Sequence, residues 1–148
     1  MSFQQRIVDA LKQSMLARDA GRTGTLRMVK AAMGYLQIER KTDVLSDADV
    51  LAVLQKEAKK RKDSIFEYEK AGRAESAATE TAELRIIEEY LPVGLTPEEV
   101  ETIVKAAIAS TGATSKKDMG AVMKAATAAA AGRADGRVLS AVVGRLLP

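Results

Sequence analysis

Apolar residues recur along almost the whole chain at the three- and four-residue spacing of an amphipathic helix. No segment shows the strict alternation of apolar and polar residues that marks a half-buried strand. The stripe formed by Leu26, Val29, Met33 and Leu36 is the clearest example, with steps of three, four and three residues. The pattern therefore predicts a helical protein.

The pattern begins with a row formed by Ile7, Leu11 and Met15, which predicts a first helix with these three residues on its buried face. This helix is expected to fray out between residues 19 and 24, where two glycines and polar residues follow. Asp135 is placed to cap a last helix toward the end of the chain.

Capping signals divide the rest of the pattern. The capping-box spacing, in which a Ser or Thr is followed three residues later by an acidic residue, marks three predicted helix starts: Ser46 with Asp49, Thr96 with Glu99, and Ser115 with Asp118. Pro97 follows the second capping residue, as expected at a first helical position. Helix ends are predicted at three glycines and one proline, which are Gly72, Pro92, Gly112 and Gly132.

These boundaries predict an all-α fold in two parts. An N-terminal helical bundle of about four helices is expected over residues 1–92, and a small three-helix tail domain over residues 95–148. The segment around residues 91–95, which contains Pro92 and Gly94, is the predicted hinge between them.

Composition supports helices and restricts the chemistry. The chain has 148 residues and 26 alanines, and Ala is the best helix former. It contains no Cys and no His, which excludes thiol and serine–histidine catalysis and the usual zinc sites. We therefore expect no catalytic residue, no metal site and no cofactor.

Positive charge is concentrated at the two ends of the chain. The net charge is +3, but residues 1–42 carry eight basic and three acidic residues, whereas residues 43–91 carry eight and twelve. This mild surplus is compatible with RNA binding without demonstrating it. The N-terminus lacks the apolar core of a signal peptide and no apolar run is long enough for a membrane span, so we expect a cytoplasmic protein without membrane contact.

The segment KEAKKRKD, residues 56–63, is the most basic run. On a helical projection most of its lysines fall opposite the apolar stripe, so a solvated helix face is favoured over a nucleic-acid site. Arg61 falls inside the stripe, with Glu57 one turn earlier. A buried guanidinium needs an acidic partner, so we expect an interhelical ion pair; a ligand-binding Arg is the alternative.

A second candidate for a phosphate-binding site lies in the tail, where Ser115 to Met123 is followed by GRADGR, residues 132–137. Glycines beside a helix start allow a phosphate to approach backbone N–H groups, and Arg133 and Arg137 supply positive charge. The capping carboxylate of Asp135 competes for the same position, so a turn that ends one helix and starts the next is favoured over an anion site. The glutamates expected on the helix that ends at Pro92, which are Glu80, Glu83, Glu88 and Glu89, predict no catalytic pair.

Four segments, taken together, resemble the YqeY family: LQKEAKKRKDSIFEYEKAGR (54–73), ELRIIEEYLP (83–92), KDMGAVM (117–123) and GRADGR (132–137). That family is similar to the C-terminal helical region of GatB, the B subunit of the tRNA-dependent amidotransferase. The resemblance implies a helical bundle followed by a tail similar to the part of the amidotransferase that touches tRNA. It also implies that the catalytic parts of that enzyme are missing here.

The resemblance and the Ala-rich stretch 125–131 together give three hypotheses. The first is a non-catalytic module that binds tRNA or a tRNA-associated complex through its tail. The second is an adaptor that docks on the helices of a protein partner. The third is an accessory of glutamine-dependent carbon–nitrogen ligase activity. The residues expected to contact RNA phosphates are Lys116, Lys117, Lys124, Arg133 and Arg137. Family members often carry Pro and Lys where this chain has the Ala-rich stretch 125–131, which removes two or three potential phosphate contacts.

Overall fold

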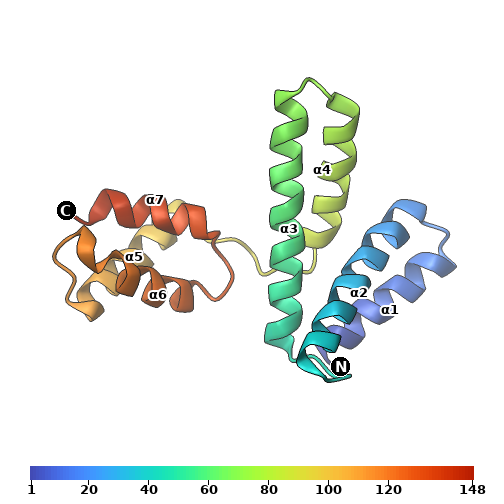
Figure 1. The fold of residues 1–148 in the computed structure, drawn as a ribbon, viewed down its shortest axis with the longest axis horizontal. Helices are drawn as coiled ribbons and strands as arrows, with labels where there is room; N and C mark the ends of the chain where they lie inside the picture. The colour runs from blue at the N-terminus through green and yellow to red at the C-terminus, as the bar shows by residue number, and fades with distance from the viewer. The chain divides into compact units, whose positions relative to one another are not determined.

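The computed structural model describes all residues 1–148 and confirms the all-α prediction (Figure 1). The elements are α1 (Phe3–Leu16), α2 (Ala20–Arg40), α3 (Asp47–Lys70), α4 (Ala74–Glu88), α5 (Pro97–Thr111), the 3₁₀ turn η1 (Lys116–Asp118), α6 (Met119–Ala130) and α7 (Gly136–Leu146).

The helices form two compact units, Met1–Leu91 and Pro92–Pro148, which we call the N-terminal and the C-terminal unit. In the N-terminal unit α3 and α4 make the most extensive pairing, and α1 packs against α2. In the C-terminal unit α5, α6 and α7 all pack against one another, with η1 at the start of α6. Each unit has a hydrophobic core of its own.

The core of the N-terminal unit is built from large aliphatic side chains of all four helices. Ile7 of α1, Met33 of α2, Leu54 of α3 and Ile87 of α4 are almost fully buried, and Leu45 joins them from the loop before α3. The stripe predicted for α2 supplies Leu26 and Val29 as well. Burying such side chains is the main source of stability of this unit.

The prediction for the first helix is wrong in two places. Met15 is half-exposed, and the buried position beside it belongs to Ser14, whose hydroxyl donates to the Leu11 carbonyl at 2.7 Å and accepts from Thr23 at 2.9 Å. The chain also does not fray over residues 19–24. Asp19 caps a new helix by accepting from the Arg22 N–H at 3.0 Å, so that α2 begins at Ala20.

The core of the C-terminal unit is built from smaller side chains. Val104 of α5, Val122 and Ala126 of α6, and Val143 of α7 are fully buried, and Leu139 is nearly so. Alanines in the core bring helices close together but bury little apolar area per residue. The hydrophobic stabilisation of this unit is correspondingly modest.

All three predicted capping boxes are present, at Ser46, Thr96 and Ser115. The third opens the 3₁₀ turn η1 rather than the α-helix itself, and α6 begins only at Met119. Gly112 caps α5 in the left-handed conformation, as its position predicts. The sixth helix, α6, ends at Ala130, two residues before the end predicted at Gly132. No helix is long and apolar enough to cross a membrane.

Two glycines in different backbone conformations should respond oppositely to the same substitution. Gly34 lies inside α2, and a methyl group added at its Cα would meet no atom within 4 Å, so Gly34→Ala should raise the free energy of unfolding by up to about 1 kcal/mol. Gly112 has φ +68°, so Gly112→Ala should lower it by about 1 kcal/mol. Urea denaturation followed by circular dichroism measures both, and a loss of stability in Gly34→Ala would contradict this assignment.

Candidate functional site

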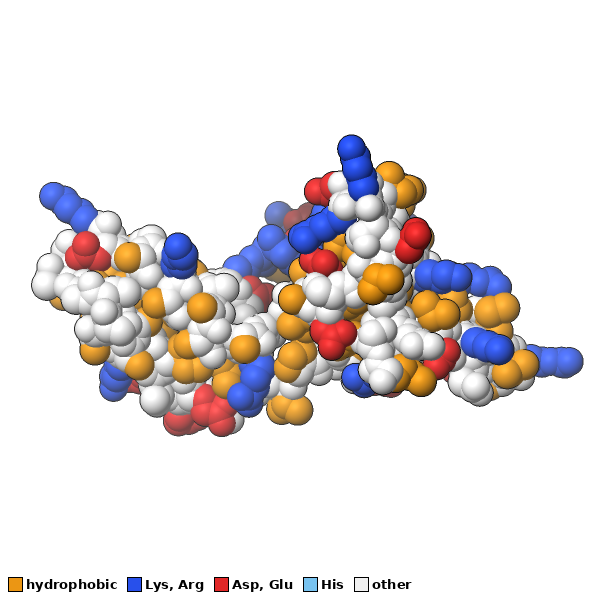
Figure 2. Space-filling model, turned by 90° about the horizontal axis from the view of Figure 1, so that it is seen from below, with side chains coloured by type: hydrophobic (Ala, Val, Ile, Leu, Met, Phe, Trp, Pro, Cys, Tyr) orange, Lys and Arg blue, Asp and Glu red, His pale blue; other side chains and the backbone are white.

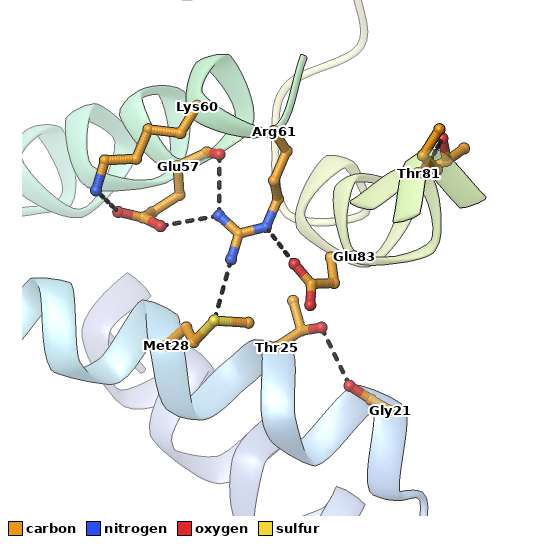
Figure 3. Close-up of polar contacts among 9 residues, drawn as sticks. Gly21, Thr25, Met28, Glu57, Lys60, Arg61, Thr81 and Glu83 are labelled. Atoms are coloured by element: carbon orange, nitrogen blue, oxygen red, sulfur yellow. Dashed lines mark hydrogen bonds and ion pairs between the residues drawn. The ribbon is translucent and has the colours of Figure 1, made fainter. Parts of the chain in front are cut away.

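The most deeply buried charge in the N-terminal unit is the guanidinium of Arg61 on α3, whose residue is only 5% exposed. Its Nη1 donates to Glu57 Oε2 at 2.9 Å and to the Glu57 carbonyl at 3.0 Å, one turn earlier in the same helix. Its Nε donates to Glu83 Oε2 on α4 at 3.1 Å (Figure 3). The predicted interhelical ion pair is therefore confirmed.

The third nitrogen of Arg61 reaches a third helix. Nη2 donates to the thioether sulfur of Met28 on α2 at 3.5 Å (Figure 3). Lys60 adds a contact from its Nζ to Glu57 at 3.3 Å on the side of the cluster nearer to solvent. No buried side-chain nitrogen or oxygen of the chain lacks a hydrogen-bond partner. The donors of Arg61 are thus used to join α2, α3 and α4, which makes this cluster structural.

Removing only the cation of this cluster should be costly. Arg61→Met leaves the buried carboxylate of Glu57 with only Lys60 as a partner and the part-exposed carboxylate of Glu83 with none, so the free energy of unfolding should fall by about 3 kcal/mol. Replacing all three, as Arg61→Met, Glu57→Leu and Glu83→Leu together, removes the buried charges and should recover most of this loss. Urea denaturation of the single and triple variants tests this, and equal losses in the two would contradict it.

A second arginine cluster joins the start of α2 to the segment after α4. Arg22 Nη2 donates to Glu89 Oε2 and, at 3.0 Å, to the Tyr90 hydroxyl, and its guanidinium lies over the Tyr90 ring. The hydrogen bond from Arg22 lowers the pKa of Glu89. The same bond, with that to Tyr90, raises the pKa of Arg22 further above its usual range.

This pair should make stability depend on pH. A carboxyl whose pKa is lowered on folding stabilises the protein above its unfolded pKa, and this contribution is lost as the pH falls through the folded pKa. Both side chains are partly exposed, so Glu89→Gln should cost about 0.2–1 kcal/mol at pH 7 and less near pH 3. Denaturation of wild type and variant at both pH values measures this, and an equal cost at the two would contradict it.

The five predicted RNA-contact residues do not form one cluster. Lys116 and Lys117 lie on η1, before the first residue of α6, whereas Arg133 and Arg137 lie beyond its last residue. The twelve residues of α6 separate these two groups by about 18 Å along the helix axis. Lys124 lies on α6 between them. All five residues are exposed, and the three lysine side chains make no ion pair or hydrogen bond.

Arg133 has a structural role in the C-terminal unit. Its Nε donates to the Val93 carbonyl at 2.9 Å, and its own carbonyl accepts from the Leu95 N–H at 2.8 Å. A looser contact of 3.8 Å runs from Nη2 to Glu99 Oε2. These bonds hold the segment before α5 against the turn between α6 and α7. The guanidinium is thus partly used within the unit, which sequence reasoning had not foreseen.

The predicted competition at the start of α7 is resolved in favour of the cap. Asp135 accepts from the Arg137 N–H at 2.8 Å and so places a carboxylate at the helix N-terminus. An anion would meet this negative charge at the position where the backbone N–H groups converge. The turn around residues 132–137 therefore ends one helix and caps the next.

Sequence reasoning missed a surface on the N-terminal unit. On α2, Tyr35 and Ile38 are about three-quarters exposed, at 73% and 76%, and Arg27 and Lys30 precede them without any partner. The end of the molecule formed by α1 and α2, at the right of Figure 2, shows basic side chains among exposed hydrophobic ones. The charge surplus of residues 1–42 was the signal that could have located it.

The acidic residues are not gathered as the ligands of a metal ion are. No group of three or more Asp or Glu residues has the arrangement to hold a metal ion. Two of the glutamates on or after α4, Glu83 and Glu89, are engaged in the arginine clusters described above.

Comparison with known proteins identifies relatives of this chain. The sequence model of the family described as Yqey-like protein matches residues 4–147. Altered inheritance of mitochondria protein 41, mitochondrial, from Vanderwaltozyma polyspora is 33% identical over 64% of this chain and 52% of its own length, and its counterpart from Kluyveromyces lactis is 36% identical over the same shares. Uncharacterized protein C22F3.15 from Schizosaccharomyces pombe is 33% identical over 62% of this chain and 73% of its own.

The chain spans about half the length of the two mitochondrial relatives that it matches. Their names place those proteins in mitochondria, and the cytoplasmic location expected for this chain stays a prediction.

Proposed function

Because the chain belongs to the YqeY family, we propose that it is a non-catalytic helical module whose C-terminal unit binds tRNA or a tRNA-associated complex. The similarity of this unit to the tail of GatB, inferred from sequence, is what favours tRNA over other RNAs. The proposal concerns contacts to phosphates and does not require the reading of base sequence.

The observation that carries the proposal is the free positive charge on η1 and α6. Lys117 lies on η1, two residues before α6 begins, and Lys124 lies in the first half of α6; both side chains are exposed and unpaired. Between them lie Gly120 and Ala121, and Gly120 has open space around it. Small residues between two lysines allow a phosphate backbone to approach the helix closely while both ammonium groups reach it.

The number of contacts limits the strength of binding. Lys116 lies beside Lys117 on η1, so this surface offers three lysines, and Arg137 lies about 18 Å away, beyond the end of α6. Each phosphate that is neutralised on a duplex steepens the dependence of log K on log salt by about 0.9. Binding through three or four contacts is therefore weak and strongly salt-dependent.

The proposal predicts that fluorescently labelled tRNA binds the full chain and that affinity falls steeply between about 50 and 200 mM salt. Lys117→Gln with Lys124→Gln should weaken binding and reduce the salt slope by about 1.8, because two phosphate contacts are lost. Fluorescence anisotropy measures both quantities.

A matched control is Lys105→Gln on α5, because Lys105 is already paired with Glu101 at 3.1 Å in the same unit. This variant should leave the salt slope unchanged. Binding that does not depend on salt, or equal effects of the control and the Lys117/Lys124 variant, would contradict the proposal.

A second candidate function is docking on the helices of a protein partner. Ala121, Ala128 and Ala129 are exposed on α6, so a partner helix could approach its axis closely. This face shares α6 with Lys124. Binding of tRNA and docking on a protein differ in their sensitivity to salt and to nuclease. The accessory role in amide formation has no residue in the structure that favours it.

A further inference from the structure

The outer face of α2 carries a repeated pattern of residues that no contact within the chain explains. Residues four apart on a helix lie above one another, so Arg27, Ala31 and Tyr35 form one row, and Lys30, Gly34 and Ile38 form the next. Each row begins with a cation, continues with a small residue and ends with a large apolar side chain. We call these six residues the α2 outer face.

The large side chains of this face lie outside the core of the unit. The core side of α2 is formed by Leu26, Val29 and Met33, whereas Tyr35 is 73% and Ile38 76% exposed. Neither Arg27 nor Lys30 has an ion-pair or hydrogen-bond partner. Tyr68 and Tyr90, by contrast, each lie beside an arginine of the chain itself, at 5.2 and 5.9 Å. Tyr35 is thus the tyrosine whose ring face is open to a ligand.

We propose that the α2 outer face binds single-stranded nucleic acid, with a base stacked on Tyr35 and flanking phosphates held by Arg27 and Lys30. A single strand presents an anionic phosphate and an apolar base with a π-face at every nucleotide, which matches the cation and apolar ends of both rows. Ala31 and Gly34 leave room between these ends for the sugar to lie against the helix, and nothing lies within 4 Å of a methyl group placed at Gly34.

The charge of the first 42 residues favours the same ligand. Lys12 on α1 and Arg18 in the turn before α2 are exposed and unpaired as well, and residues 1–42 carry five more basic than acidic residues. Such a surplus attracts a polyanion over a distance of about one Debye length, in a salt-dependent way. An acidic protein helix would also satisfy the cations, but it does not present a stacking π-face at every residue as a single strand does at every nucleotide.

Because the chain contains no Trp, a single introduced Trp reports on binding at its own position without background fluorescence from other indoles. In Tyr35→Trp the new indole is the only one, and saturating oligouridylate should quench its fluorescence as a base stacks on it. Tyr68→Trp is the matched control on α3 of the same unit, and its fluorescence should not respond. Oligothymidylate of the same length separates RNA from DNA, and an RNA duplex, whose bases are already stacked, should quench the indole at position 35 little.

Affinity measurements on the same strand separate stacking from charge. Tyr35→Ala should weaken binding about five- to a hundredfold, and Tyr35→Phe should retain it, because the phenyl ring still stacks. Arg27→Gln with Lys30→Gln should reduce the salt slope by about 1.4, whereas Lys56→Gln with Lys62→Gln on α3 should not change it. All these positions are exposed, and circular dichroism verifies that each variant is folded.

The inference is independent of the function proposed for the C-terminal unit, and the outcomes distinguish the two. Adding Lys117→Gln and Lys124→Gln to the Tyr35→Trp variant should leave the quenching of its indole unchanged. If tRNA binding depends on those lysines but the indole of Tyr35→Trp is not quenched, this inference is wrong and the proposed function stands. Two results would overturn the inference. One is that the strand does not bind; the other is that both the strand and heparin bind and that Tyr35→Ala changes neither affinity. The second result would assign the face to polyanions or acidic proteins in general.

Discussion

The arrangement of the N-terminal unit depends on the need to satisfy one buried guanidinium. Arg61 cannot lose its charge at any ordinary pH and is almost fully removed from water, so each of its nitrogens needs an acceptor. Those acceptors come from its own helix, from Glu83 on α4 and from Met28 on α2. The angle and register of three helices are therefore tied to one side chain, while the aliphatic core supplies most of the free energy. A buried charge of this kind restricts how helices can pack more than it stabilises them.

Much of the fold was predictable because helix signals are local. The stripe of α2, the three capping boxes and the left-handed cap at Gly112 depend on residues within a few positions of one another. The errors occurred where a tertiary contact decided the outcome. Ser14 is buried in place of Met15 because Thr23, across the α1–α2 turn, donates a hydrogen bond to its hydroxyl. Sequence spacing could place Arg61 in the apolar stripe, but it could not identify Glu83 as the partner.

The candidate site was less predictable for a similar reason. The residues at 116, 117, 124, 133 and 137 are basic and exposed, but their separation along α6 follows from the helix boundaries. That Arg133 is partly used by the Val93 carbonyl could not be predicted, because the bond joins segments forty residues apart. The α2 outer face was overlooked although its charge was noticed, since exposure of Tyr35 and Ile38 is decided by which side of α2 faces the core.

The small side chains in the core of the C-terminal unit bear on how the protein is degraded in a cell. A core of valines and alanines buries less apolar area than the leucine-, isoleucine- and methionine-containing core of the N-terminal unit, so its helices open more readily. Proteases cut chains in opened segments, and their rate follows the population of the open form when closing is fast. We therefore expect turnover of this protein to start in the C-terminal unit, and a partner that binds there to lengthen the lifetime of the whole chain by holding that unit closed.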